Sequence, residues 1–296
     1  CTYSGSTGIR NLFGGTKTYT CSFKISAGSD TVSFSSTTFT GINNLDFTGF
    51  TGSWSGNVIT VNGNLTFGAG MTVTASANTL TLGSTSGTKT ITSNGVAIDR
   101  PVTFNGVGGT WQLVDAMTVG SSRTVTLTNG TLDANGFNVT CGLFNSSNSN
   151  TRTLTMGSGT WTLTGIGTVW NFGTTTNLTY NVNTSTVTVT DTSSATKTLN
   201  FAPTVAFNNL VIPAGGTGNI NLTASGGRAI TSMSVTGPKT LTWASGSSYT
   251  ITNAPTITSS LTQPVTFLSS TPGTQYTLSV ASGTVGSRFM SIFDCI

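Results

Sequence analysis

One short unit recurs along the chain and constrains its fold more than any other feature. Each copy has a basic residue, then threonine, an apolar residue and a further polar residue, as in Lys239-Thr240-Leu241-Thr242. Copies begin at Lys17, Lys89, Arg123, Arg152, Lys197 and Lys239. Alternation of threonine with Val, Leu or Ile is the period-two pattern of a β-strand with one buried face. The chain is therefore predicted to reiterate one short β unit.

The composition indicates a folded chain whose polar surface is almost uncharged. Apolar residues make up 35% of the 296 residues, whereas charged residues make up only 6%. Ordinary soluble domains have about 25% charged residues. Here Ser, Thr, Asn and Gly replace them, all seven acidic residues are Asp, and there is no His. Such a composition is typical of long extracellular β structures, so we expect a location on a virion surface or outside the cell.

The net charge of +4 does not indicate nucleic acid as a partner. Lys and Arg are scattered singly from Arg10 to Arg288, whereas a phosphate-binding surface needs several cations on one face. No apolar run approaches the ~20 residues of a membrane-spanning helix. Cys1 is not preceded by Met or by a signal-peptide pattern, and the sequence stops abruptly at Ile296. We therefore expect a fragment of a longer chain.

Short predicted strands alternate with turn signals along the chain. Asn-Gly pairs favour turns, because both residues tolerate positive φ, and they begin at Asn62, Asn94, Asn105, Asn129 and Asn135. The predicted strands are Val58–Val61, Leu65–Phe67, Met71–Thr74, Thr79–Leu82, Thr88–Thr92, Thr124–Thr128, Thr153–Met156, Thr160–Thr164, Thr186–Thr190, Leu210–Ile212, Lys239–Trp243, Tyr249–Thr252 and Tyr276–Val280. No helix is predicted, since glycine interrupts every window in which apolar residues recur at three and four.

Two all-β architectures fit this pattern: a parallel β-solenoid (β-helix) with irregular turns, and tandem antiparallel β-sandwiches. The repeat favours the solenoid. Gly-Thr-Trp occurs at Gly109–Trp111 and Gly159–Trp161, and the basic unit recurs at intervals of 29 to 72 residues, which suits a solenoid with variable loops. Turns of ~20 residues, stacked at about 4.8 Å, predict an object about 70 Å long. Residues 1–296 then form one continuous repetitive region, with a possible sub-boundary near 200–215.

Three segments resemble parts of large Thr- and Gly-rich β-solenoid proteins. They are TLDANGFNVT (131–140), VAFNNLVI (205–212) and the tail from VTFLSSTPGT (265–274) through SGTV (282–285). Similar segments occur in phage virion proteins, including fibres and surface projections, and in bacterial surface adhesins of the haemagglutinin-repeat kind. The resemblance covers about half of the chain. It implies a fold and a location, but it transfers no active site.

The sequence contains few residues that are suited to catalysis. The carboxylates are Asp30, Asp46, Asp99, Asp115, Asp133, Asp191 and Asp294. They are spread singly, although stacked turns could bring a pair such as Asp99 and Asp115 together. Without His, Ser and Cys lack their usual base, and no spacing of metal ligands is present. We therefore assign no catalytic, cofactor-binding or metal-binding residue, leave the ligand-binding residues open, and do not expect an enzyme.

The tryptophans remain as candidates for ligand binding, and the cysteines as candidates for contacts between turns. Outward-facing Trp54, Trp111, Trp161, Trp170 and Trp243 could stack on sugar rings, and inward-facing ones would fill the core. Trp161 and Trp243 share a strand face with apolar neighbours, which predicts burial. Cys1 and Cys21, twenty residues apart, would lie on adjacent turns of a solenoid. Two ordinary buried thiols fit the sequence equally well.

The expected function is a structural and attachment protein of a phage virion that forms a rigid β scaffold. The first alternative is a bacterial cell-surface adhesin, and the second is a carbohydrate- or ice-binding solenoid whose flat threonine array is the active surface. Strand edges at the ends of a solenoid invite association. The expected partners are therefore further copies of the chain, with a trimer favoured by the resemblance, other virion or cell-surface proteins, and host surface glycans.

Overall fold

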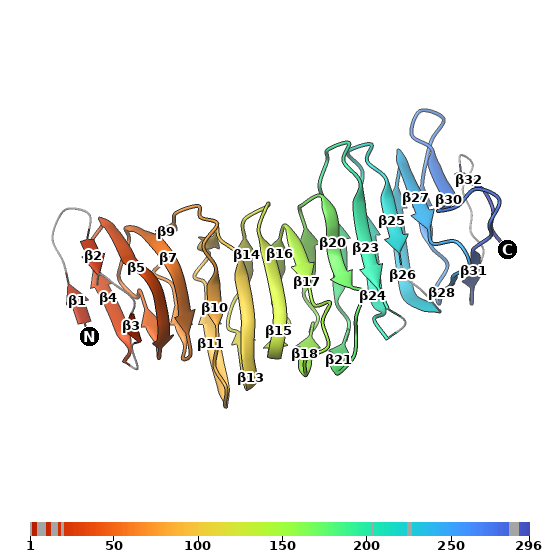
Figure 1. Cartoon of the computed structure of the whole chain (residues 1–296). Helices are drawn as coiled ribbons and strands as arrows, with labels where there is room; N and C mark the ends of the chain where they lie inside the picture. Colours follow the sequence, from red (N-terminus) through yellow and green to blue (C-terminus); the bar gives the residue numbers. More distant parts are fainter. Residues whose placement is uncertain are drawn as a thin grey trace.

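A computed structural model describes residues 2–4, 10–12, 17–18, 21–202, 204–223, 227–283 and 290–296. All regular structure in these ranges is β-strand, and no helix occurs there. The strands stack side by side from the N-terminus to the C-terminus in a parallel β-solenoid of about 12 turns (Figure 1). Every strand ladder is parallel, as in β13–β15, β19–β22 and β27–β30. The predicted solenoid is confirmed, and the alternative of antiparallel sandwiches is wrong.

The ladders form three stacks of parallel strands, here called stacks A, B and C. Some long strands bend from one stack into the next. Stack A contains β2 (Arg10–Leu12), the starts of β5 (Thr31–Ile42) and β7 (Ser53–Val61), β9 (Thr72–Val73), β12 (Ala97–Ile98), β14 (Met117–Val119), β16 (Val139–Cys141), β19 (Thr160–Leu163), β22 (Thr186–Val189), β24 (Phe207–Ile212), β26 (Arg228–Thr236), β28 (Ser248–Ile251), β29 (Thr256–Thr258) and β31 (Thr277–Val280).

Stack B and stack C share β13 and β15. Stack B contains β3 (Lys17–Thr18), the ends of β5 and β7, β10 (Leu80–Leu82), the starts of β13 (Val102–Leu113) and β15 (Thr124–Asp133), β17 (Leu143–Asn145), β20 (Gly167–Phe172), β23 (Lys197–Phe201), β25 (Ile220–Thr223), β27 (Lys239–Trp243), β30 (Val265–Ser269) and β32 (Met290–Ile292). Stack C contains β1 (Thr2–Ser4), β4 (Phe23–Ala27), β6 (Leu45–Asp46), β8 (Leu65–Thr66), β11 (Thr88–Thr92), the ends of β13 and β15, β18 (Arg152–Thr155) and β21 (Leu178–Asn181).

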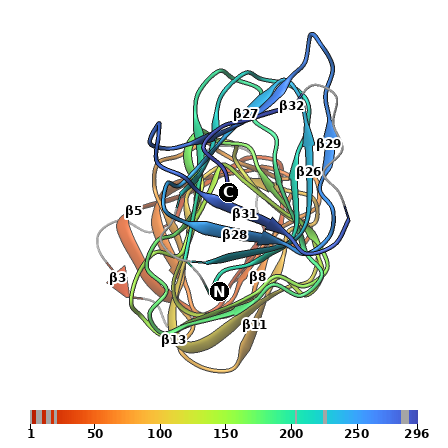
Figure 2. The same ribbon diagram turned by 90° about the vertical axis from the view of Figure 1, so that its right-hand side faces the viewer.

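The turns vary in length, and the number of strands in each turn changes along the chain. Paired residues one turn apart are 19 positions apart at Ser53 and Thr72 and 29 apart at Asn171 and Asn200. Twelve turns at about 4.8 Å make a stack about 60 Å long, shorter than expected because most turns exceed 20 residues. Among the described residues stack C ends at β21, and the later turns have strands in stacks A and B. The molecule steps sideways at that point (Figures 1 and 2).

The predicted strands all coincide with observed ones, but two of the Asn-Gly turns do not reverse the chain. Asn105-Gly106 lies inside β13 and Asn129-Gly130 inside β15. At both places one strand bends from stack B into stack C. Gly130 has φ 75°, and a Cβ there would lie 2.2 Å from the Gly106 carbonyl oxygen of the preceding turn. Here glycine therefore makes a corner within a strand and not a hairpin.

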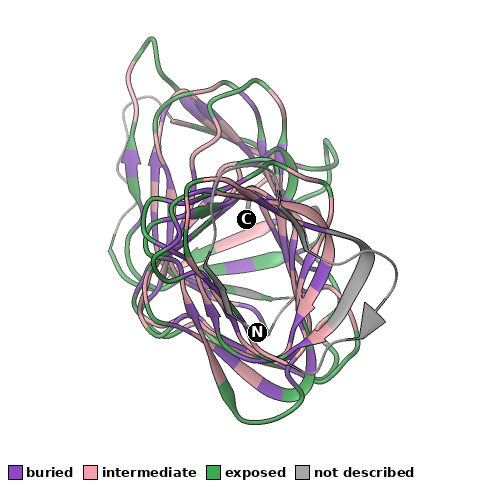
Figure 3. Ribbon diagram, turned by 90° about the vertical axis from the view of Figure 1, so that its left-hand side faces the viewer, coloured by how far each residue is buried: buried purple, intermediate pink, exposed green. Residues whose placement is uncertain are grey.

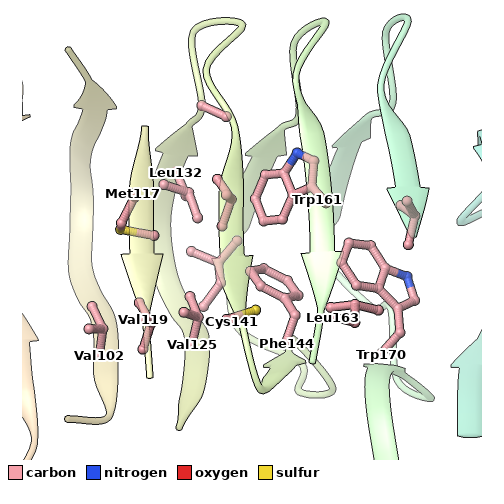
Figure 4. Close-up of a cluster of buried hydrophobic side chains, with 14 of the residues drawn as sticks. Val102, Met117, Val119, Val125, Leu132, Cys141, Phe144, Trp161, Leu163 and Trp170 are labelled. Atoms are coloured by element: carbon pink, nitrogen blue, oxygen red, sulfur yellow. The ribbon is translucent and has the colours of Figure 1, made fainter. Parts of the chain in front are cut away.

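Inward side chains form one continuous apolar core along the axis. In β19 the burial alternates strictly, with Trp161 and Leu163 fully buried between partly exposed threonines. Figure 3 shows buried residues alternating with more exposed ones along the strands, and Figure 4 shows Trp161, Trp170 and Phe144 meeting inside the turns. The Phe144 ring centroid lies 5.3 Å from that of Trp161 and 5.0 Å from that of Trp170. Aromatic packing thus ties consecutive turns together.

Several features singled out in the sequence lie outside the described residues. They are Cys1, and with it the pairing of Cys1 with Cys21, the end of the first basic unit (Tyr19 and Thr20), and Thr284 and Val285 of the tail.

Candidate functional surface

The outer side of stack C carries a regular grid of polar side chains, here called the threonine face. One column contains Thr88, Thr110, Thr131, Thr153 and Thr179, each in register with the next. The parallel column contains Thr90, Gln112, Asp133, Thr155 and Asn181. Neighbours within a column are about 4.8 Å apart, and the columns are about 6.6 Å apart. The strands thus present hydroxyl and amide groups at fixed two-dimensional spacings.

Side-chain hydrogen bonds hold the second column in place. The Gln112 amide donates to Asp133 Oδ2 over 2.9 Å, and the Asn181 amide donates to Thr155 Oγ1 over 3.2 Å. Similar ladders occur on the other stacks, where the Asn129 amide donates to Asn105 Oδ1 over 2.7 Å. Because these side chains bond across neighbouring turns, parts of the threonine face are ordered by amide and carboxylate hydrogen bonds.

A shallow groove borders the threonine face where the strands of stack C end. Its volume is about 510 Å³. Three consecutive turns line it, with Asp133, Asn135, Gly136, Thr155, Gly157, Ser158, Asn183 and Thr184. Asn135 and Asn183 both have φ 51°, and the Asn135 N–H donates to Asp133 Oδ1 over 2.8 Å. These left-handed turns orient a polar wall along the edge of the face.

Of the seven Asp residues considered as candidate catalytic carboxylates, only Asp133 lines this groove. Asp46 forms an ion pair with Lys24 at 2.9 Å, and Asp191 forms one with Lys197 at 2.6 Å. Asp294 Oδ2 accepts a hydrogen bond from the Gly273 N–H over 3.1 Å. The described carboxylates are thus used singly along the molecule.

Asp99 and Asp115, the pair that stacked turns could have joined, have separate partners. Asp99 forms an ion pair with Arg123 at 2.8 Å. Asp115 accepts hydrogen bonds from the backbone N–H groups of Ser93 (2.7 Å) and Asn94 (2.6 Å). One carboxylate pairs with a cation and the other holds a turn, so the structure gives each a structural role.

Asp46 and Asp191 are held in the charged form. Burial acts to raise the pKa of Asp46, but hydrogen bonds from Thr48 and Lys24 outweigh it, and the pKa is lowered. At Asp191 the same balance, with Lys197 and Ser193 as donors, also lowers the pKa. A general acid needs a raised pKa, so neither carboxyl suits that role.

The buried basic side chains were not predicted. Arg152 is 1% exposed, and its guanidinium donates to the carbonyl oxygens of Ser146 (2.6 Å), Thr174 (2.8 Å), Asn150 (2.8 Å) and Thr176 (2.9 Å). Its Nε also donates to the Ser146 hydroxyl over 2.8 Å. Burial lowers the Arg152 pKa. One guanidinium group thus hydrogen-bonds to the carbonyl oxygens of two loops that leave stack B on successive turns.

Lys197 and Lys239 close loops in the same way. The Lys197 ammonium donates to the Ser193 carbonyl oxygen over 2.7 Å, and that of Lys239 donates to the carbonyl oxygens of Gly215 and Gly216. The signal for this burial was present in the sequence. In the five basic units from Lys89 onward, the cation stands two positions before a buried apolar residue, such as Leu199 or Leu241, and therefore shares its side of the strand.

Arg100 is a further buried cation that lies outside the repeated unit. Its guanidinium carbon is 4.3 Å from the Trp54 ring centroid, and its N–H groups approach the Gly56 and Asn57 carbonyl oxygens at 3.4 Å. Burial, together with the charge of Arg123, lowers its pKa to about 10. The contact with the indole face compensates part of the cost of burying the charge.

All five tryptophans are buried, with exposures of 0% or 1%. The burial predicted from strand parity is confirmed, so none of them offers an aromatic platform for sugars. Cys141 is buried and its pKa is raised to about 12 by burial, whereas Cys21 and Cys295 are partly exposed free thiols. Among the described residues no group of three or more His, Cys, Asp or Glu side chains could hold a metal ion.

No helix in the described part of the chain is long and apolar enough to cross a membrane. Comparison of the sequence with protein-family models and with curated proteins, and comparison with solved structures, found no match.

Proposed function

We propose that this chain is a non-enzymatic structural component of a phage virion, forming a rigid part of a tail fibre or surface projection. The observation that carries the proposal is the continuous parallel solenoid with a largely apolar core and an ordered, nearly uncharged polar surface. Such a stack resists bending, because each turn is hydrogen-bonded to the next along its whole length. The resemblance of the Thr- and Gly-rich segments to virion solenoids supports the same conclusion.

Localisation tests this proposal against a bacterial adhesin, which would use the same scaffold to span a cell envelope. Antibodies raised against the purified chain are applied to particle and cell-envelope fractions of a culture that produces it. Labelling of purified phage particles, seen by immunogold electron microscopy, supports the virion role. Labelling confined to cell envelopes would replace it with the adhesin.

The absence of catalysis is tested separately. We expect the purified chain to leave bacterial capsular and cell-wall polysaccharides intact, as measured by the release of reducing ends. Release of reducing ends that disappears in a single Asp→Ala variant would contradict the proposal.

A second candidate function, the binding of a crystalline surface such as ice, is favoured by the register of the threonine face. Five threonines in one column and the neighbouring polar column make a regular grid. Thermal hysteresis of a purified solution tests it. Hysteresis that is lost in the Thr131→Lys variant supports ice binding, and a freezing curve equal to that of a control protein removes this candidate.

A further inference from the structure

The groove beside the threonine face has the composition of a site for a polyhydroxylated ligand. Its eight lining residues are polar side chains or glycines, and none is Lys or Arg. Neutral sugars are bound by side chains that both donate and accept hydrogen bonds, such as hydroxyls, amides and carboxylates. An anionic ligand would meet the Asp133 carboxylate without a lysine or arginine in the lining to compensate it.

Several polar atoms in the groove remain available for such a ligand. Within the described residues, the hydroxyls of Ser158 and Thr184 have no hydrogen-bond partner. Each oxygen of Asp133 accepts one hydrogen bond, from Asn135 or from Gln112, and a carboxylate oxygen has two lone pairs. Donors and acceptors therefore face the same space.

Glycine keeps the groove open and backbone bonds keep it rigid. At Gly136 a Cβ would lie 3.1 Å from Ser158 Oγ, inside the groove. The Gly157 N–H donates to Asn183 Oδ1 over 3.3 Å and links two of the three turns. Figure 1 shows these turns following β15, β18 and β21 as neighbours along the axis. A site that exists before binding costs less ordering entropy on binding.

We propose that this groove binds a neutral oligosaccharide segment that lies parallel to the solenoid axis. Three turns span about 10 Å, so a ligand in the groove contacts polar side chains on each turn: Asp133 and Asn135, then Thr155 and Ser158, then Asn183 and Thr184. A cavity of about 510 Å³ lies within the usual range for ligand sites. The inference rests on the proposed role in a tail fibre or surface projection, and it adds a binding place and a class of ligand.

The test uses the purified chain and a printed array of neutral and anionic glycans, followed by calorimetric titration of the best binder. We expect binding to a neutral glycan and weaker binding to its sulfated or carboxylated analogues. Substitution Ser158→Trp fills the groove and should weaken binding at least tenfold. Ser122→Trp is the matched control, since Ser122 is also an exposed corner serine and lies outside the groove; binding should be unchanged there.

Two outcomes overturn the inference: no neutral glycan bound above background, or equal binding by the Ser158→Trp and Ser122→Trp variants. Melting temperatures of both variants show whether the fold is intact. An Asp133→Asn variant gives a second measurement: it should reduce the affinity for the neutral glycan and also weaken the preference for neutral over anionic ligands, because the carboxylate charge that disfavours anions is removed. The localisation experiment does not depend on any of these results, so failure of the glycan site and failure of the virion role are distinguishable.

Discussion

The corner between stacks B and C is made differently in the turns of β13 and β15 and in the turns that follow them. In the early turns β13 and β15 bend without interruption from stack B into stack C, and glycine occupies the bend, as at Gly130. In the later turns the chain leaves stack B on loops, such as the one between β17 and β18, and a buried cation closes the loop. The same basic unit occurs in both parts, but Lys89 stays partly exposed and Arg152 is buried.

The difference shows what a solenoid needs at a corner. A strand that bends keeps most of its backbone groups in the ladder, whereas a loop withdraws its carbonyl oxygens from it. Buried carbonyl groups without partners cost about 1–3 kcal/mol each. Arg152 and Lys197 supply those partners from the start of the strand that follows the loop, and Lys239 supplies them to a loop of the preceding turn. The chain can therefore vary its loop lengths without losing the stack.

The end of stack C is a further case in which a turn takes the place of a strand. Between β23 and β24 a tight turn, in which the Val205 N–H donates to the Ala202 carbonyl oxygen over 2.9 Å, replaces a strand. Tyr180 of β21 reaches this turn through its hydroxyl, 3.0 Å from the Ala206 carbonyl oxygen. The later turns are therefore continuous with the earlier ones through the core.

The largest expected effect is at the junction of the two regions. The Trp170 ring contacts Phe144 at 5.0 Å in the preceding turn and Phe207 at 6.1 Å in the following one. Trp170→Ala should cost about 3–5 kcal/mol and should lower the urea midpoint of the later turns first. Thr168→Ala, an exposed change on the same strand, is the control and should cost less than about 0.5 kcal/mol. Equal midpoints for the two variants would contradict the packing described.

The next effect separates the two kinds of corner. Arg152→Met removes the donor from the buried Ser146 carbonyl oxygen and from three partly buried carbonyl oxygens, and it should cost about 3 kcal/mol or more. Arg123→Met removes a partly exposed pair with Asp99 in the early turns and should cost about 0–1 kcal/mol. Urea unfolding followed by circular dichroism measures both. A loss at Arg123 as large as that at Arg152 would mean that the buried cation does not close the later corners.

Lys239 allows the same comparison with a smaller cation. Lys239→Met should cost about 1–3 kcal/mol, since the Gly215 and Gly216 carbonyl oxygens lose their donor. Lys89→Met is the matched change in the early turns and should be nearly neutral. Hydrogen exchange of residues 213–219 should increase in the Lys239 variant alone; unchanged exchange there would contradict the role assigned to Lys239.

Acid should destabilise the later turns more than the early ones. The pKa values of Asp191 and Asp46 are lowered in the folded chain. Their contribution is therefore complete above the unfolded pKa of about 4 and is lost as the pH falls below it. The Asp191–Lys197 pair is the more buried, with side chains 19% and 1% exposed against 29% and 47% for Asp46–Lys24. The fall in melting temperature between pH 7 and pH 3 should therefore be reduced more by Asp191→Asn than by Asp46→Asn. The reverse order would refute this.

The strands could be predicted from the sequence because Thr-apolar alternation is a local signal. Thr88–Thr92 and Lys239–Trp243 match observed strands at both ends. The irregular repeat interval also has a structural reason, since the basic units fall on two different stacks: β11 and β18 in stack C, β23 and β27 in stack B. Parallel pairing itself is non-local, and only the repetition of the unit pointed to it.

Neither the groove nor the conformation of the corners could be predicted from the sequence. Asp133 was recognised as a turn residue, but its meeting with Ser158 and Asn183 depends on turn lengths, which no local pattern specifies. Asn129-Gly130 has the sequence of a hairpin turn, and only the stack of glycine corners beneath it, at Gly106, decides that the strand continues. The trimer, the virion location and the sub-boundary near 200–215 stay predictions.

Distances along the threonine face test the parallel stack most directly. Spin labels are attached to a cysteine at Thr88 and to a second cysteine at Thr110, Thr131, Thr153 or Thr179, in a background without Cys1, Cys21 and Cys295. Cys141 can remain, because its burial and raised pKa make it unreactive. In-register parallel turns predict that the distance grows by about 4.8 Å with each successive site, to about 19 Å at Thr179. Distances that do not rise steadily with turn number would contradict the parallel solenoid.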